Sequence, residues 1–585
     1  MKKTLISFLS CALLVSACGP SSDPNADPNA LVEAKGGKYY GGTFLVNESD
    51  YIKNLFPHNI IDAISYRVAS QIYEGLMKFD QKDLSLKTGI AESYTVDSSQ
   101  TVYTFKLRKG VLFHDDDCFS GGKGREVTAE DVKYCFTLLC TPSVTNQGFS
   151  CLDGIVKGAK EYYAAAKDGK KPGFEVEGIK VIDASTIQFT LTAPNSIFLN
   201  NLARPFTFIF PKEAYEKYDK EMRIKAVGTG PFSISKVEEG NVVVLKKNEN
   251  YYLSDKDGNK LPYLNGIKVK FLKDKKSELL EFKNGRLNMM YRMPTDYIIE
   301  IEEQTAQKTG VYGEYELQRT PEMATHLLCF LNNGKMFSNK NLRKAISFAI
   351  NRKKILEAVL NGEGYWHAIY GLTPVDAFKG YDVKKIKGYD LNLDSANYYL
   401  KKAGFKRGAD VPKITLELNA DGNRNIPVAE EVKKQLKENL NITVDINVVT
   451  TPQLAEIMQS GKSDFFRLGW FADYPSPENF LWFLYGKNVP ATMDKISYPN
   501  FTRYVNPKFD ELYEAGLRAK TQEEAYDYFL KAEQVAMDDA PVIALWYDEG
   551  YRLLQSTVRG LDNNAMQYRD FTGVYFIPDT KKPAK

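Results

Sequence analysis

Few residues in this 585-residue sequence have the types and spacing that catalysis or metal binding requires. Neither an HExxH pair, nor a paired-cysteine zinc spacing, nor a G-x-S-x-G nucleophile elbow occurs. Gly461-Lys462-Ser463 resembles the end of a phosphate loop, but Glu456 stands where that motif needs its first glycine. The four histidines are far apart in the chain: His58, His114, His326 and His367. The sequence therefore predicts no catalytic residue, no metal and no cofactor.

One carboxylate has a position that suggests binding chemistry. Asp473 follows the stretch 464–470, which alternates as a strand, and precedes Ser476-Pro477-Glu478, which has the pattern of a helix N-cap and first turn. Inside a cleft, a carboxylate at this place would bind a cation. At an ordinary turn it would cap the backbone, and nearby Arg467 would pair with a surface acid. The residue types alone allow both interpretations.

The N-terminus has the pattern of a secretion signal. Lys2 and Lys3 precede an apolar run over 4–15, which is too short to cross a bilayer core of about 30 Å as a helix. Small residues then precede Cys18, as in a bacterial lipobox. We expect 1–17 to be the signal peptide and 18–38 to be a lipidated cysteine with a flexible tether, since 19–30 is polar and Pro-rich. An ordinary signal peptide with an incidental cysteine is the alternative.

The overall charge gives no reason to expect a nucleic-acid partner. The formal net charge is +3, and removal of Lys2 and Lys3 brings the chain closer to neutrality. Hydrophobic residues make up 43% and charged residues 26%, which is typical of a globular protein. The length predicts several lobes rather than one core.

Five cysteines remain after Cys18. One disulfide is plausible outside the cytoplasm, with Cys118–Cys140 and Cys140–Cys151 as candidates, and a set of buried thiols is the alternative. The pairing cannot be read from the sequence. The five are Cys118, Cys135, Cys140, Cys151 and Cys329.

The elements around Asp473 indicate α/β winding. Residues 414–418 and 442–448 alternate as strands on either side of a helix over 428–438, which predicts a parallel βαβ unit. A helix over 452–459 and a strand over 464–470 continue the pattern. Ligands of such sheets bind beyond the carboxyl ends of the strands, which directs attention to the residues just after Trp470.

The N-terminal half is expected to contain strands and helices in alternation. The predicted elements are a strand over 43–46, a helix over 63–77, a strand over 102–107 and a helix over 129–139 behind Thr128. The acidic run 115–117 opens a Gly-rich segment, 115–125, that is typical of a surface loop.

Six stretches, in order, resemble the family-5 extracellular solute-binding proteins of ABC importers, in particular the oligopeptide-binding type. Each is weak alone, and together they indicate a resemblance over about residues 41–560, nearly the whole mature chain. The stretches are 72–76 (IYEGL), 104–115 with 128–132, 228–232 (GTGPF) with 250–252, 342–355 (LRKAISFAINRKKI), 467–481 (RLGWFADYPSPENFL) and 532–547.

The resemblance implies a fold and its division into lobes. The fold is α/β, periplasmic-binding-protein-like type II, with a hinged two-lobe cleft and an extra third lobe. Lobe I would comprise 39–62, 206–325 and 544–585, lobe II would be the extra lobe at 63–205, and lobe III would be 326–543. The segments 206–210 and 539–545 are the candidates for the chain crossovers.

The resemblance also implies the roles of three residues. Asp473 would form an ion pair with the α-ammonium of a peptide, Trp470 would pack beside it, and Arg467 would face the C-terminal carboxylate of a short peptide. Affinity would come from strand-like hydrogen bonds to the peptide main chain, because these ignore the side chains.

The expected function is therefore that of a monomeric, lipid-anchored protein of the cell envelope that captures short peptides and delivers them to the permease subunits. It would not be an enzyme. The alternatives are a family member that binds nickel, haem or a sugar, and a lipid-anchored peptidase. The scarcity of histidine argues against nickel.

Overall fold

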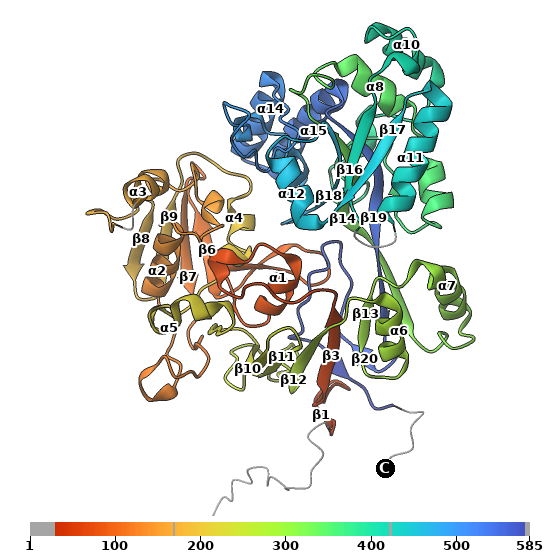
Figure 1. The fold of residues 1–585 in the computed structure, drawn as a ribbon. Helices are drawn as coiled ribbons and strands as arrows, with labels where there is room; N and C mark the ends of the chain where they lie inside the picture. The colour runs from red at the N-terminus through yellow and green to blue at the C-terminus, as the bar shows by residue number, and fades with distance from the viewer. Residues whose placement is uncertain (1–29, 168–169, 421–423, 580–585) are drawn as a thin grey trace, which may run out of the picture.

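The computed structural model describes residues 30–167, 170–420 and 424–579. Its strands form three main sheets in separate regions (Figure 1). The first has the order β10-β11-β12-β3 and the second the order β6-β7-β9-β8. Their bounds are β3 Thr43–Glu48, β10 Phe232–Glu238, β11 Val242–Lys247, β12 Gly266–Phe271, β6 Ala91–Val96, β7 Val102–Leu107, β8 Ile179–Asp183 and β9 Thr186–Thr190.

The third sheet carries the predicted α/β winding. It has the order β13-β19-β14-β18-β16-β17, with β15 on β19, and β16 is parallel to both β17 and β18. The parallel βαβ unit is therefore confirmed. The bounds are β13 Met289–Tyr291, β14 Glu316–Phe330, β15 Trp366–His367, β16 Ile414–Asn419, β17 Val444–Val449, β18 Phe465–Phe471 and β19 Val542–Leu554.

Helices pack against the sheets, and several short strands pair with one another outside the three main sheets. The helices are α1 Ala63–Ala69, α2 Ala129–Leu139, α3 Ala159–Ala165, α4 Phe198–Asn201, α5 Lys212–Tyr218, α6 Lys275–Lys283, α7 Ile298–Gln307, α8 Lys340–Phe348, α9 Arg352–Lys354, α10 Leu393–Lys402, α11 Asn425–Leu440, α12 Thr451–Gln459, α13 Glu478–Trp482, α14 Pro507–Arg518 and α15 Gln522–Asp539. The short strands are β1 Val32–Glu33, β2 Tyr39–Tyr40, β4 Met77–Phe79, β5 Leu86–Thr88, β20 Val558–Arg559 and β21 Tyr575–Phe576.

Two long strands connect the upper and lower regions of Figure 1. β14 and β19 pair antiparallel over most of their length, and β19 continues to β13 in the lower region. The predicted crossover 539–545 overlaps the start of β19. The other predicted crossover, 206–210, contains no strand, because Pro205–Thr207 is a 3-10 helix and no strand follows it there. The lobe boundaries themselves stay a prediction, and those at 325/326 and 543/544 fall inside β14 and β19.

Helix α1 is shorter than the predicted 63–77. It ends at Ala69 because the next carbonyls bond to another segment: Gln71 accepts from the Phe232 amide at 3.0 Å and Ile72 from the Gly230 amide at 2.8 Å. A Cβ on Gly228 would lie 2.2 Å from the Ile72 oxygen. Gly228 and Gly230 therefore allow a close backbone approach, and strand β10 follows them.

The flexible tether was predicted to extend to residue 38, but in the structure it ends earlier, because residues before 38 already form a strand. Strand β1 pairs with β2, and the hairpin is fixed by Lys38, whose amine forms ion pairs with Asp255 and, at 2.9 Å, with Asp257. The signal peptide, Cys18 and residues 19–29 lie outside the described residues. In the described part of the chain no helix is long and apolar enough to cross a membrane.

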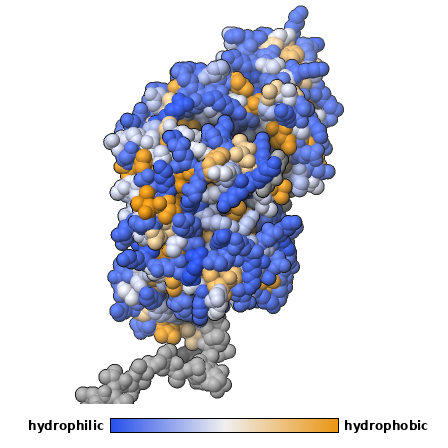
Figure 2. Space-filling view, turned by 90° about the vertical axis from the view of Figure 1, so that its left-hand side faces the viewer, coloured by the Kyte–Doolittle hydropathy of each residue, from blue (hydrophilic) through white to orange (hydrophobic). Residues whose placement is uncertain are grey.

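The cores lie between the sheets and their helices, and the face shown in Figure 2 carries only small, separate hydrophobic groups on a mainly hydrophilic surface. All five cysteines after Cys18 are free thiols, and four of them are buried. Of the two alternatives for these cysteines, the structure has the thiols rather than a disulfide.

Candidate functional site

The carboxyl end of β18 and helix α13 position Trp470 and Asp473 together. The side-chain oxygen of buried Asn479 accepts a hydrogen bond from the Trp470 indole at 3.2 Å and another from the Asp473 amide at 3.1 Å. Asn479 of α13 thus fixes both the indole ring of Trp470 and the start of the loop that contains Asp473. The Asp473 side chain remains 46% exposed, so that its carboxylate is accessible from outside.

Asp473 faces a buried arginine from a distant segment. Arg204 follows α4, and its Nη2 lies 3.4 Å from Asp473 Oδ2. The guanidinium sits over the rings of Phe206 and Tyr474, at 5.2 and 5.1 Å from their centroids. This ion pair joins the region of α4 to the end of β18.

Aromatic rings surround this ion pair. Trp470 packs at 5.1 Å from Phe483 and at 6.3 Å from Trp482, and Trp482 contacts Tyr498 edge-on at 6.1 Å. Tyr498 is 58% exposed. The site thus offers a carboxylate beside exposed aromatic surface, which suits an amine with an adjoining apolar group.

Arg467 belongs to a different cluster. Neighbouring strand residues alternate between faces, so Arg467 and Trp470 lie on opposite faces of the sheet. Arg467 Nη2 lies 2.7 Å from His326 Nδ1, and His326 Nε2 lies 2.9 Å from Asp548 Oδ2. Burial lowers the pKa of His326 to about 3, so the imidazole is neutral at pH 7. A proton on Nε2 then donates to Asp548 while Nδ1 accepts from Arg467.

Asp548 is the centre of a buried ionic network between β14 and β19. Its carboxylate accepts from Arg292 at 2.6 Å and from Arg424 at 3.1 Å, and Arg292 also binds Glu322 at 2.6 Å. Burial alone would raise the pKa of Asp548, but the two guanidinium groups and His326 hold it well below its ordinary value. The network connects Arg292, directly after β13, with Arg424, directly before α11.

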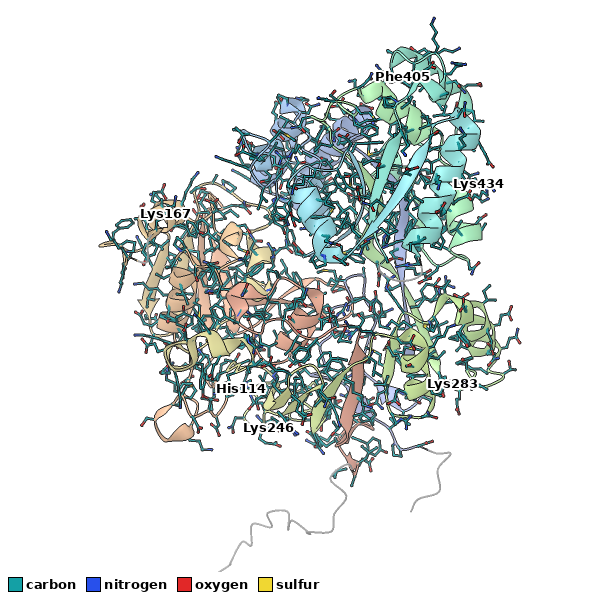
Figure 3. The ribbon with its side chains drawn as sticks, viewed as in Figure 1. His114, Lys167, Lys246, Lys283, Phe405 and Lys434 are labelled. Atoms are coloured by element: carbon teal, nitrogen blue, oxygen red, sulfur yellow. The ribbon has the colours of Figure 1, made fainter. Side chains whose placement is uncertain are left out.

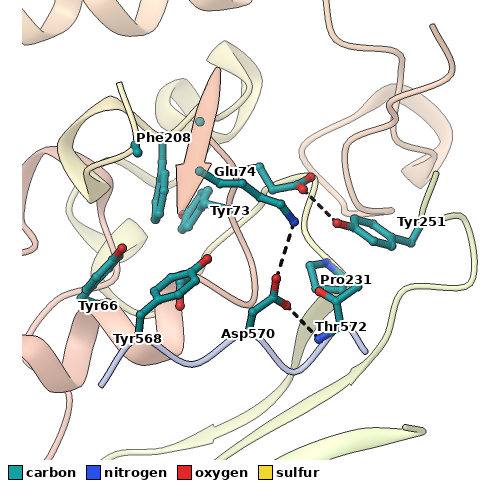
Figure 4. A pocket seen from close by; sticks show the side chains of 13 residues that line it. Tyr66, Tyr73, Glu74, Phe208, Pro231, Tyr251, Tyr568, Asp570 and Thr572 are labelled. Carbon is teal, nitrogen blue, oxygen red and sulfur yellow. Dashed lines mark hydrogen bonds and ion pairs between the residues drawn. The ribbon is translucent and has the colours of Figure 1, made fainter. Parts of the chain in front are cut away.

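Two pockets flank these clusters. The first is lined by aromatic rings and by Glu74, Lys78 and Asp570, and Lys78 Nζ lies 3.5 Å from Asp570 (Figure 4). Burial raises the pKa of Glu74, whose carboxylate accepts from three hydroxyl groups, those of Thr229, Tyr251 and Tyr252. The second pocket lies beside Arg467 and is otherwise mostly apolar, with lining from β14, β16, β19 and α11.

Metal binding finds no support in the described part of the chain, where no group of three or more His, Cys, Asp or Glu side chains could hold an ion. His114 lies in the lower part of the molecule (Figure 3), where its ring bonds to the Gly230 carbonyl at 2.9 Å. Burial lowers the pKa of His58 to about 3 and that of His114 to about 4. These histidines are structural.

Sequence reasoning missed several residues that the structure adds to the site. Arg204 is the single charge inside the apolar run 202–210, and Asp548 directly follows the apolar run 541–547. That contrast was the available signal. Asn479 carried no signal apart from its place in α13. The networks of Arg292, Arg424 and Arg467 depend on contacts between distant segments, which the sequence does not show.

The comparisons with known proteins agree with the observed fold. The model of the bacterial extracellular solute-binding proteins, family 5, matches residues 85–491, well over half of the chain. The chain belongs to this family. Its members are the solute-binding proteins of ABC importers rather than enzymes.

Similar proteins extend over nearly the whole chain. The oligopeptide-binding protein of Bacillus subtilis is 26% identical over 549 residues, 92% of each chain, and the heme-binding protein A of Haemophilus influenzae is 24% identical over 98% of each. The periplasmic binding protein DppA of Helicobacter pylori, solved in complex with the peptide STSA, superposes with a TM-score of 0.76 at 24% identity, covering 92% of this chain and 98% of its own. The fold is thus the expected periplasmic-binding-protein-like type II fold.

Proposed function

We propose that this family member captures short peptides outside the cytoplasm and delivers them to the permease of an ABC importer, held at the membrane by lipid on Cys18. Asp473 binds the peptide amine, Trp470 packs beside it and Arg467 binds the terminal carboxylate. The observation that carries the proposal is the half-exposed Asp473 carboxylate at the carboxyl end of β18, next to a tryptophan fixed by Asn479.

Chemistry and relatives support a peptide. An exposed carboxylate among aromatic rings recognises an ammonium group. Hydrogen bonds to the main chain of an extended peptide would let one site accept many sequences, because they ignore the side chains. Relatives named as oligopeptide-binding and di/tripeptide-binding proteins match 92% and 84% of this chain. A relative named as a heme-binding protein matches as much of the chain, so haem is included in the test.

The test is calorimetric titration of the mature protein with short peptides. Asp473→Asn should weaken binding about 10- to 100-fold, because a charge-assisted hydrogen bond contributes about 1.5–3 kcal/mol. Acetylation of the peptide amine should weaken binding to the wild type by a similar factor. Glu456→Gln, on exposed α12, is the matched control and should bind normally.

Three results would count against the proposal. Unchanged affinity in Asp473→Asn would remove Asp473 from the site. Saturable haem binding without any peptide binding would favour the haem alternative. Cleavage of the peptides by the pure protein would favour the peptidase.

A further inference from the structure

Arg204 differs from other buried arginines of this protein in how its donors are used. Arg343 and Arg352 are as buried as Arg204, and each donates to three main-chain carbonyl oxygens. Arg204 is 8% exposed, and within the described ranges its hydrogen-bond acceptor is Asp473 alone, at the long distance of 3.4 Å. A guanidinium has five N–H donors, so most of the hydrogen-bonding capacity of Arg204 is left for another group.

The guanidinium is held in place. Phe206 and Tyr474 lie against it at 5.2 and 5.1 Å, and the chain before it is fixed by Ser196, whose amide donates to the Leu517 carbonyl at 2.8 Å. A ligand amine that binds Asp473 therefore meets Arg204 rather than displacing it into solvent. A ligand whose ammonium group binds Asp473 must therefore tolerate a second positive charge beside it, that of Arg204.

We propose that Arg204 is a specificity-determining residue that binds an acidic group of the ligand, so that the preferred cargo is a peptide with a glutamate or aspartate as its first residue. The inference rests on the proposed function, because it takes Asp473 as the site of the peptide amine. Since Arg204 and Asp473 touch each other, the amine and the acidic group must lie within about one residue of each other.

The charges at the site explain the selectivity. A ligand carboxylate completes an Arg204–carboxylate pair with better geometry than the 3.4 Å contact to Asp473, and it leaves Asp473 to the ammonium. A neutral amide in the same place gives only a weaker hydrogen bond. A lysine side chain there brings a second cation against Arg204, which disfavours binding.

The experiment measures the affinity of three peptides that differ in the first residue: Glu-Ala-Ala, Gln-Ala-Ala and Lys-Ala-Ala. The wild type should bind the glutamate peptide about tenfold or more tightly than the glutamine peptide, and the lysine peptide should bind most weakly. Arg204→Gln should bring the glutamate-to-glutamine ratio close to one by weakening the glutamate peptide. Arg204→Lys should keep part of the preference, and Arg286→Gln, an exposed arginine elsewhere, should keep all of it.

The outcomes separate this inference from the proposed function. If no peptide binds the folded wild type, both fall. If the glutamine peptide binds and the glutamate peptide has no advantage, only the role of Arg204 falls. If Arg204→Gln raises the affinity for all three peptides equally, Arg204 occupies the place of the ligand amine at Asp473 and does not determine specificity. The wild-type ratio decides the matter even if the variants fail to fold.

Discussion

At the scale of single residues, the site depends on which groups hold the ligand-binding side chains. Asn479 touches Trp470 and the Asp473 backbone through a single oxygen and is fully buried. An effect of this residue on a ligand therefore acts through Trp470 and Asp473, which makes Asn479 a positioning residue.

Replacing Asn479 with leucine should lower both stability and affinity. The indole N–H and the Asp473 amide lose their acceptor, which should reduce the free energy of unfolding by about 1–3 kcal/mol. Peptide affinity measured by calorimetry should fall as well, since Asp473 is no longer oriented. Asn397→Leu on exposed α10 is the control, and equal effects of the two changes would contradict the positioning role.

Arg467 has a separate prediction because it lies on the other face of the sheet from Trp470. If Arg467 binds the terminal carboxylate, Arg467→Gln should weaken peptides of one length much more than shorter or longer ones. A length series from two to five residues, measured by calorimetry, checks this. A uniform loss over the series would instead indicate damage to the His326–Asp548 network.

At the scale of elements, β14 and β19 carry the buried network between the upper and lower regions. Asp548 is fully buried, and its carboxylate bonds to Arg292, Arg424 and His326. Since Asp548 lies on β19, Arg292 next to β13 and Arg424 before α11, a change at this carboxylate acts on three elements at once.

Asp548→Asn should destabilise the protein in a pH-dependent manner. Removal of one partner from a buried ion pair costs about 3–5 kcal/mol. The pKa of Asp548 is lowered in the folded protein, so its contribution is complete above the unfolded pKa of about 4 and is lost as the pH falls towards the folded pKa. Denaturant unfolding should show a constant gap between wild type and variant above pH 5 that narrows below pH 4. A gap independent of pH would exclude the charge as its cause.

The elements that could be predicted from the sequence are those with strong local signals. The alternating strands β16, β17 and β18 and the capped helix α2 follow from periodicity and from Thr128. Helix α1 was predicted too long because its period continues after Ala69, whereas the carbonyls of Gln71 and Ile72 bond to amides at the start of β10 and just before it. The length of β14 and β19 could not be predicted either, because the two strands are far apart in the sequence and pair only in the folded chain.

The same limit applies to the site. Asp473 and Trp470 could be proposed because the motif lies at the end of a predictable strand. Arg204 is 269 positions away from its acidic partner, so only the folded chain shows them together.

At the scale of the whole molecule, contacts between the α4 region and the C-terminal helices hold the upper and lower parts together on one side. The Ser196 amide donates to the Leu517 carbonyl at 2.8 Å and its hydroxyl to the Gly516 carbonyl at 3.1 Å. Opening of the proposed cleft between these parts would have to break these contacts together with Arg204–Asp473.

A disulfide in place of these contacts should lock the cleft. In the double variant Ser196→Cys with Leu517→Cys, oxidation should slow peptide association about tenfold or more, since binding then requires a motion that is blocked. Reduction should restore the rate, as measured by stopped-flow fluorescence. Ser196→Cys alone is the control, and equal rates in the oxidised and reduced forms would show that the contact survives opening.

The last strand of the described chain, β21, lies against β2 and β3, near the start of the described chain. Phe576 of β21 stacks on Phe44 of β3 at 6.0 Å, and its ring lies against Gly42. A biosensor chip, a bead or a fluorescent label attached at residue 30 or at residue 579 would therefore hold the protein by the same side. Helix α10 and the upper lobe would then point away from the support, so both attachment schemes should report the same peptide binding.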